Sequence, residues 1–119
     1  MSQPHVLCRY DDIAENACRS FVLGSGRERL DIFIVRQEGE VHGYVNSCPH
    51  AGTPLDWLPD RFLTPDNRFL MCTTHGALFE VKDGMCVRGP CRGIPLEKLP
   101  ILVENGDVVL LPPPPEDAA

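Results

Sequence analysis

The sequence predicts an all-β protein built from antiparallel sheets. Short apolar runs recur along its 119 residues and are interrupted every few positions by Gly, Asn or Asp, a pattern typical of short strands joined by turns. Two of these turns are clearly marked. Asn105-Gly106 separates two apolar runs, and residues 37–40, Gln-Glu-Gly-Glu, join two others. Both sequences favour tight hairpins, so the strands on either side of each turn are expected to pair with one another.

We expect strands at residues 6–10, 20–23, 31–37, 41–46, 69–72, 77–81, 101–104 and 107–111. Residues 32–35 are all apolar, which predicts a strand buried on both faces. The 41–46 strand alternates in character, so His42 is predicted to be a strand-face residue and not a ligand. Only residues 11–18 have helical character. Four prolines and an acidic end predict an extended tail over residues 112–119.

Composition limits the partners that the chain can have. A chain of this length forms one domain with a modest core. The net charge is −6, the pI is about 5.1 and there is no basic run, which argues against nucleic acid and anionic membrane surfaces. A basic docking surface on a protein partner fits this balance better. Without an export signal or a long apolar segment, we expect a soluble, cytoplasmic protein.

Two short clusters combine cysteine with histidine. The first is Cys48-Pro49-His50, and the second, after 21 intervening residues, is Cys72-Thr73-Thr74-His75-Gly76. In an extended segment residues i and i+2 point to the same side, and in a tight turn residues i and i+3 are neighbours. Each pair can therefore reach a single metal unit. Two thiolates and two imidazoles suit a pair of irons bridged by sulfide, with thiolates on one iron and imidazoles on the other.

The segments around these pairs resemble the two cluster loops of Rieske-type [2Fe-2S] ferredoxins. Residues 48–55 read Cys-Pro-His-Ala-Gly-Thr-Pro-Leu, and residues 72–79 read Cys-Thr-Thr-His-Gly-Ala-Leu-Phe. Asp83-Gly84 and Gly89-Pro90 resemble the hairpin and the proline loop that cover the cluster in that family. The resemblance implies a Rieske fold over residues 1–111, with a smaller cluster-binding part at about residues 45–92, and one [2Fe-2S] cluster per chain.

The resemblance also implies the ligands. Cys48 and Cys72 would hold the inner iron, and His50 and His75 the outer one. Replacing two thiolates by imidazoles raises the reduction potential above that of an all-cysteine cluster. Such a cluster has no open iron position for a substrate, and the chain shows no second motif of two histidines and a carboxylate. We therefore expect an electron carrier that is not an enzyme by itself.

The function implied by the resemblance is a ferredoxin that carries single electrons from a flavin-dependent reductase to a terminal oxygenase. One alternative is a small Rieske subunit fixed within a larger reductase, of the assimilatory nitrite reductase type. Another is a zinc-binding module, although Cys-x-His is too short for the commoner zinc knuckles.

Other positions are assigned to packing or to the surface. Cys8 and Cys18 are expected to be small buried hydrophobes, and His5 a surface residue. Cys86 and Cys91 flank a loop at residues 87–90. We expect them to fill space behind the cluster, with pairing or redox activity as the alternative.

The potential is expected to be low. High-potential members of the family carry an extra cysteine in each cluster loop and a hydroxyl residue after the His-Gly. This sequence has Thr53, Thr74 and Ala77 at the corresponding positions. A disulfide and a hydrogen bond to cluster sulfur are then both missing, which lowers the potential.

Overall fold

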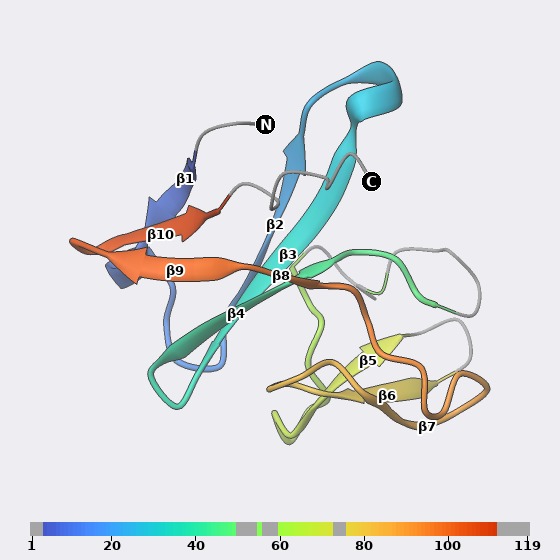
Figure 1. Ribbon diagram of the computed structural model, residues 1–119. Coiled ribbons are helices and arrows are strands. Elements are labelled where there is room, and N and C mark those ends of the chain that lie inside the picture. The colour runs from blue at the N-terminus through green and yellow to red at the C-terminus, as the bar shows by residue number, and fades with distance from the viewer. Residues whose placement is uncertain (1–3, 50–54, 56–59, 73–75, 112–119) are drawn as a thin grey trace, which may run out of the picture.

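The computed structural model describes residues 4–49, 55, 60–72 and 76–111, and over these residues the all-β prediction is confirmed (Figure 1). The strands form three antiparallel sheets. The terminal sheet contains β1 (His5–Arg9), β10 (Asp107–Leu110) and β9 (Ile101–Glu104), in that order. The central sheet contains β2 (Cys18–Leu23), β3 (Leu30–Gln37), β4 (Glu40–Val45) and β8 (Lys98–Leu99). The small sheet contains β5 (Phe69–Cys72), β6 (Ala77–Glu80) and β7 (Cys86–Arg88).

Both predicted hairpin turns are present. Glu38 and Gly39 have φ values of 55° and 79°, and Asn105 and Gly106 have values of 52° and 81°. Positive φ at both central residues is the geometry of the turn that matches the twist of two paired strands. The first turn joins β3 to β4, and the second joins β9 to β10.

Strand β3 is buried on both faces, as its continuous apolar run predicts. Every residue from Ile32 to Val35 is 0% exposed. Phe33 and Val35 belong to the apolar cluster that extends to the small sheet, whereas Ile34 packs with Ile13 and Val108 beneath the terminal sheet. The ring of Phe33 stacks on that of Phe62 at a centroid distance of 4.1 Å. The central sheet thus lies between two separate apolar cores.

The prediction of helical character at residues 11–18 is wrong. The chain forms a short 3-10 helix, η1 (Tyr10–Asp12), and then turns toward the central sheet. Asn16 has a φ of 62°, its N–H donates to the carbonyl of Arg36 at 2.7 Å, and the N–H of Arg36 donates to Ala17 at 3.1 Å. These backbone groups bond to the end of β3 and are not available to a helix.

Two strands were not predicted. Residues 87–90 were expected to form a loop, but β7 extends to Arg88. β8 has two residues and pairs with Gly43 and Tyr44 of β4. A second 3-10 helix, η2 (Gly26–Glu28), lies between β2 and β3. Across the described residues, no helix is long and apolar enough to span a bilayer.

Candidate metal centre

The first cysteine of the predicted site follows β4 and is buried. Cys48 is 1% exposed, and the chain before it is held at two points. The hydroxyl of Tyr44 donates a buried hydrogen bond of 2.6 Å to the carbonyl of Val81, which joins β4 to the turn after β6. The N–H of Asn46 donates to the carbonyl of Asp31 at 2.8 Å. These bonds fix the end of β4 immediately before Cys48.

A side-chain hydrogen bond connects the two ends of the first cysteine loop. The amide oxygen of Asn46 accepts the backbone N–H of Leu55 at 2.8 Å, and Leu55 itself is 0% exposed. We call this contact the Asn46 clasp. Nothing in the local sequence signals a bond across nine positions, so the alternating pattern of the 41–46 strand does not predict this role of Asn46.

The second cysteine ends β5 and is equally buried. Cys72 is 0% exposed and lies opposite Ala77, the first residue of β6. Gly76 has a φ of 67°, and a Cβ placed there would meet no atom within 4 Å among the described residues. On the other side of Ala77, a Cβ on Gly89 would lie 2.8 Å from the Cα of Ala77. The turn after Cys72 is therefore open at Gly76 and closely packed at Ala77.

Cys48 and Cys72 belong to one apolar cluster. Its other members include Leu55, Ala77, Cys86 and Cys91, so two separate loops bring their thiols into the same core. His50 and His75 lie outside the described residues, as do the neighbouring residues 51–54, 73 and 74. Within the described ranges, three or more His, Cys, Asp or Glu side chains nowhere gather in a metal-binding group.

Cys86 and Cys91 are buried, as their expected role in packing requires. They are 2% and 1% exposed, and neither forms a disulfide. The thiol of Cys91 donates to the sulfur of Cys86 at 3.2 Å, and the thiol of Cys86 donates to the carbonyl of Arg88 at 3.2 Å. Burial raises the pKa of Cys91 to about 12, and the nearby Cys86 and Cys48 act in the same direction. Cys91 is thus a buried thiol in the same apolar cluster as Cys48.

The remaining cysteines and histidines lie elsewhere. Cys18 is 9% exposed as expected, and burial raises its pKa to about 12, while Cys8 is only partly buried. His42 lies on β4 as predicted, 3.8 Å from a carboxylate oxygen of Glu40. Burial, followed by the positive charge of Lys98, lowers the pKa of His42. His5 is exposed, as predicted.

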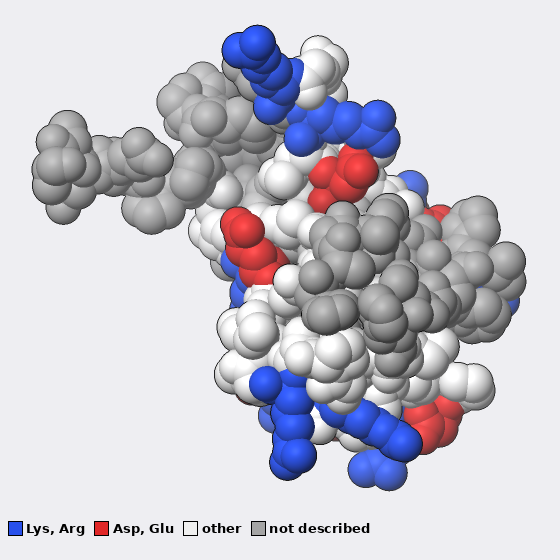
Figure 2. Space-filling model, turned by 90° about the vertical axis from the view of Figure 1, so that its right-hand side faces the viewer, with Lys and Arg blue, Asp and Glu red and all other residues white. Residues whose placement is uncertain are grey.

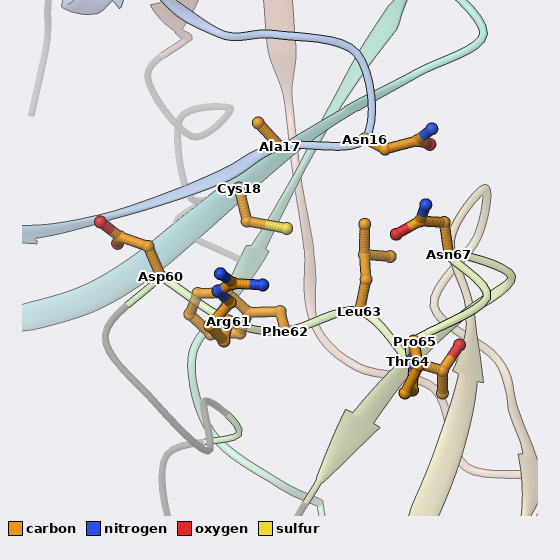
Figure 3. Close-up of a pocket in the computed structure, with 10 residues that line it drawn as sticks. All are labelled: Asn16, Ala17, Cys18, Asp60, Arg61, Phe62, Leu63, Thr64, Pro65 and Asn67. Atoms are coloured by element: carbon orange, nitrogen blue, oxygen red, sulfur yellow. The ribbon is translucent and has the colours of Figure 1, made fainter.

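A pocket of about 520 Å³ lies between the start of β2 and the segment that precedes β5 (Figure 3). Cys18 and Phe62 line one part of it, and Asn16 and Asn67 line another. Neither Cys48 nor Cys72 is among the residues that line it.

A comparison with protein-family models identifies the family of this fold. The model of the Rieske [2Fe-2S] domain matches residues 3–100, which is most of the chain. The chain belongs to the Rieske [2Fe-2S] domain family. The cofactor of this family is a Rieske-type [2Fe-2S] cluster, so the zinc-module interpretation is set aside. Two buried thiols that reach one apolar cluster from separate loops fit the requirement of such a cluster for thiolate ligands.

The curated relatives that this chain matches are much longer than the chain itself. Apoptosis-inducing factor 3 of Mus musculus and that of Homo sapiens are each 30% identical to this chain over 78 residues. The match covers 66% of this chain but only 11% of the relatives' length.

Solved structures share the fold along nearly the whole chain. The ferredoxin of carbazole 1,9a-dioxygenase from Nocardioides aromaticivorans IC177 has a TM-score of 0.73 and 21% identity. That match covers 93% of this chain and 99% of the ferredoxin. A chain from the complex of reduced oxygenase and oxidized ferredoxin in carbazole 1,9a-dioxygenase matches with a TM-score of 0.74, 21% identity, and coverage of 93% and 94%.

Proposed function

We propose that this Rieske protein is an electron carrier, which passes single electrons from a flavin-dependent reductase to a terminal oxygenase. The observation that carries the proposal is the burial of Cys48 and Cys72 in one apolar cluster, each at the start of a segment with a histidine two or three residues later. The fold shared with a dioxygenase ferredoxin supports it. The domain would cover residues 1–111, with the cluster-binding part at about residues 45–92.

The proposed ligands are Cys48, His50, Cys72 and His75. When bound, the cluster supplies one-electron oxidation and reduction. The protein's part is to hold two thiols away from water, because water and competing ligands would otherwise reach the sulfurs. The Asn46 clasp closes the first loop, and the pairing of Cys72 with Ala77 fixes the second. Two neutral histidines would then complete the ligand set with groups that can lose a proton on oxidation.

Metal analysis tests the proposal directly. The purified protein should contain about two irons and two acid-labile sulfides per chain and show a red-brown colour. His75→Ala removes a proposed ligand and should lose iron and colour. His5→Ala removes an exposed histidine outside the proposed site and should retain both. Stoichiometric zinc without labile sulfide, or an unchanged spectrum in His75→Ala, would overturn the ligand assignment.

A fixed subunit of a larger reductase is the second candidate, because the curated relatives contain the domain as 11% of a longer chain. Gel filtration with a candidate flavoprotein separates the two functions. A carrier should elute by itself at micromolar concentration and exchange electrons in repeated encounters. A stable stoichiometric complex would favour the fixed subunit.

A further inference from the structure

The loop between β7 and residue 93 is held tightly against the two cysteine segments. Gly89 contacts the backbone of Ala77, and its φ of 108° suits glycine. The N–H of Arg92 donates to the carbonyl of Gly89 at 3.2 Å, and that of Gly93 donates to the carbonyl of Cys86 at 2.9 Å. The Cys91 side chain is buried in the cluster that contains Cys48 and Cys72. The loop therefore lies directly beside the proposed metal site.

Two arginines project from this anchored loop. Arg88 and Arg92 are exposed, and within the described residues no carboxylate lies within 4.0 Å of either guanidinium. Three other arginines differ in this respect: Arg9, Arg29 and Arg36 lie within 4.0 Å of Asp107, Asp31 and Glu15 respectively. The two loop arginines thus add positive charge next to the site, in a chain of net charge −6.

The acidic residues of the small-sheet hairpin, Glu80 and Asp83, lie toward its turn, whereas Arg88 lies toward its open end. Arg88 pairs with Leu78, at the end of the sheet where Cys72 pairs with Ala77. Asp83 lies in the turn between β6 and β7, at the other end of the same hairpin. Figure 2 shows the face toward which the loop after β7 points, with Lys and Arg side chains along its lower part and again at its top, and Asp and Glu side chains between them and at the lower right.

Exposed apolar side chains lie on the same loop and its stem. Val87 is 37% exposed and Ile94 is 52% exposed, and Pro90 is exposed at the turn. Transient electron-transfer interfaces are small, and a few apolar contacts beside complementary charges are sufficient for them. Residues 87–94 offer both features on one short segment, which we call the arginine loop.

We propose that the arginine loop is the docking edge of this protein and that it binds an acidic, partly apolar surface on its redox partner. This inference rests on the proposed carrier function. It also reverses the expectation from net charge, which favours a basic partner surface. The local charge prevails because salt screens charges beyond about 10 Å at 0.1 M ionic strength, so that an approaching surface responds mainly to the residues that it meets.

Small inorganic oxidants test the local charge without any protein partner. The reduced protein is mixed with ferricyanide, an anion, or hexaammineruthenium(III), a cation, in a stopped-flow instrument at low ionic strength. Arg88→Glu with Arg92→Glu should slow oxidation by ferricyanide about tenfold and speed oxidation by the cation, because the charge beside the site changes sign. Raising the salt concentration should reduce both effects.

A matched control carries the same change in net charge at distant positions. Arg27 lies in η2 and Arg68 precedes β5, at the end of that strand opposite Cys72, and both are exposed. Arg27→Glu with Arg68→Glu should change the two rates less than twofold, by the same screening. Equal effects of both double variants, or no effect of either, would overturn the proposal. A shift in midpoint potential large enough to explain the rates would also overturn it.

These outcomes are distinguishable from failure of the proposed function. Iron and sulfide content, measured in each variant first, reports on the cluster itself. A protein with a full cluster and no response to the loop charges would refute the docking edge and leave the electron carrier in place. With a candidate oxygenase, the loop variant should lower the second-order electron-transfer rate, whereas the control variant should not.

Discussion

At the scale of single residues, Ala77 limits what the second loop can do for the proposed cluster. Its side chain is 0% exposed, lies opposite Cys72 and is covered by Gly89. A methyl group donates no hydrogen bond, so the side chain at position 77 supplies no donor to stabilise negative charge on a sulfur. A hydroxyl here would provide such a donor, since donors aimed at cluster sulfur favour the reduced state.

The midpoint potential should therefore lie near the lower end of the Rieske range, at about −150 mV. Ala77→Ser should raise it by about 40 mV, because one net hydrogen bond of about 1 kcal/mol corresponds to that change for one electron. Ala14→Ser, at an exposed position, is the control and should leave it unchanged. Protein-film voltammetry at neutral pH makes the measurement, and a wild-type midpoint well above zero would contradict the prediction.

At the scale of elements, the side chain of Asn46 connects the two ends of the first cysteine loop. The Asn46 clasp spans the loop, and Leu55 is the buried residue at which the chain returns to the core. Because the bond is made to a backbone N–H, its loss leaves a partly buried donor without its acceptor. Such a loss costs more than the net value of the hydrogen bond itself.

Asn46→Ala should lower the free energy of unfolding by about 1–3 kcal/mol and speed the loss of iron to a chelator. Asn46→Asp keeps an acceptor oxygen and should recover much of the stability. Urea denaturation and the absorbance decay in the presence of chelator report the two effects. An Asn46→Ala protein with wild-type stability and iron retention would mean that the loop is held by other contacts.

Some of the strands could be predicted from the sequence pattern alone, and others could not. The apolar run at residues 32–35 and the Asn-Gly turn predict β3 and the β9–β10 hairpin, because burial and turn geometry are both local properties. β7 and β8 were missed because they have only three and two residues. Strands this short form through pairing with neighbouring strands and leave little pattern in their own sequence. Residues 11–18 were misassigned because their backbone groups bond to Arg36, a partner distant in sequence.

The candidate site likewise has features that the sequence predicts and features that it does not. The cysteine-histidine spacing proposes Cys48 and Cys72 as ligands, since the residue types and spacing that suit a metal are local features of a sequence. The Asn46 clasp and the position of Cys91 beside Cys48 depend on how separate segments pack. The unpaired state of Arg88 among the described residues could not be predicted either, because a sequence lists charges without their neighbours.

At the scale of the whole molecule, the proposed ligands predict that metal binding and folding are coupled. Cys48 and Cys72 lie in the larger apolar cluster, together with Phe33, Phe62 and Phe79 from three different segments. Without iron, the proposed link between the two loops that enter this cluster would be lost. The smaller cluster beneath the terminal sheet shares no residue with it.

Removing the iron should therefore destabilise the protein globally. We expect the melting temperature to fall by about 10 °C or more, since each kcal/mol of lost binding energy lowers it by about 4 °C at this length. Thermal unfolding followed by circular dichroism, before and after chelation and again after reconstitution, checks the prediction. Identical melting curves with and without iron would show that the core folds independently of its metal.

Adjacent residues of strand β3 pack into different apolar cores. Phe33 and Val35 face the core that contains the cysteines, whereas Ile34, between them in sequence, faces the core beneath the terminal sheet. Side chains on a strand alternate between faces, so a change at one position is felt on one side of the sheet only. Evolution can thus adjust the surroundings of the metal at positions 33 and 35 while position 34 keeps the rest of the domain intact, and substitutions along this strand should show effects that alternate with a period of two.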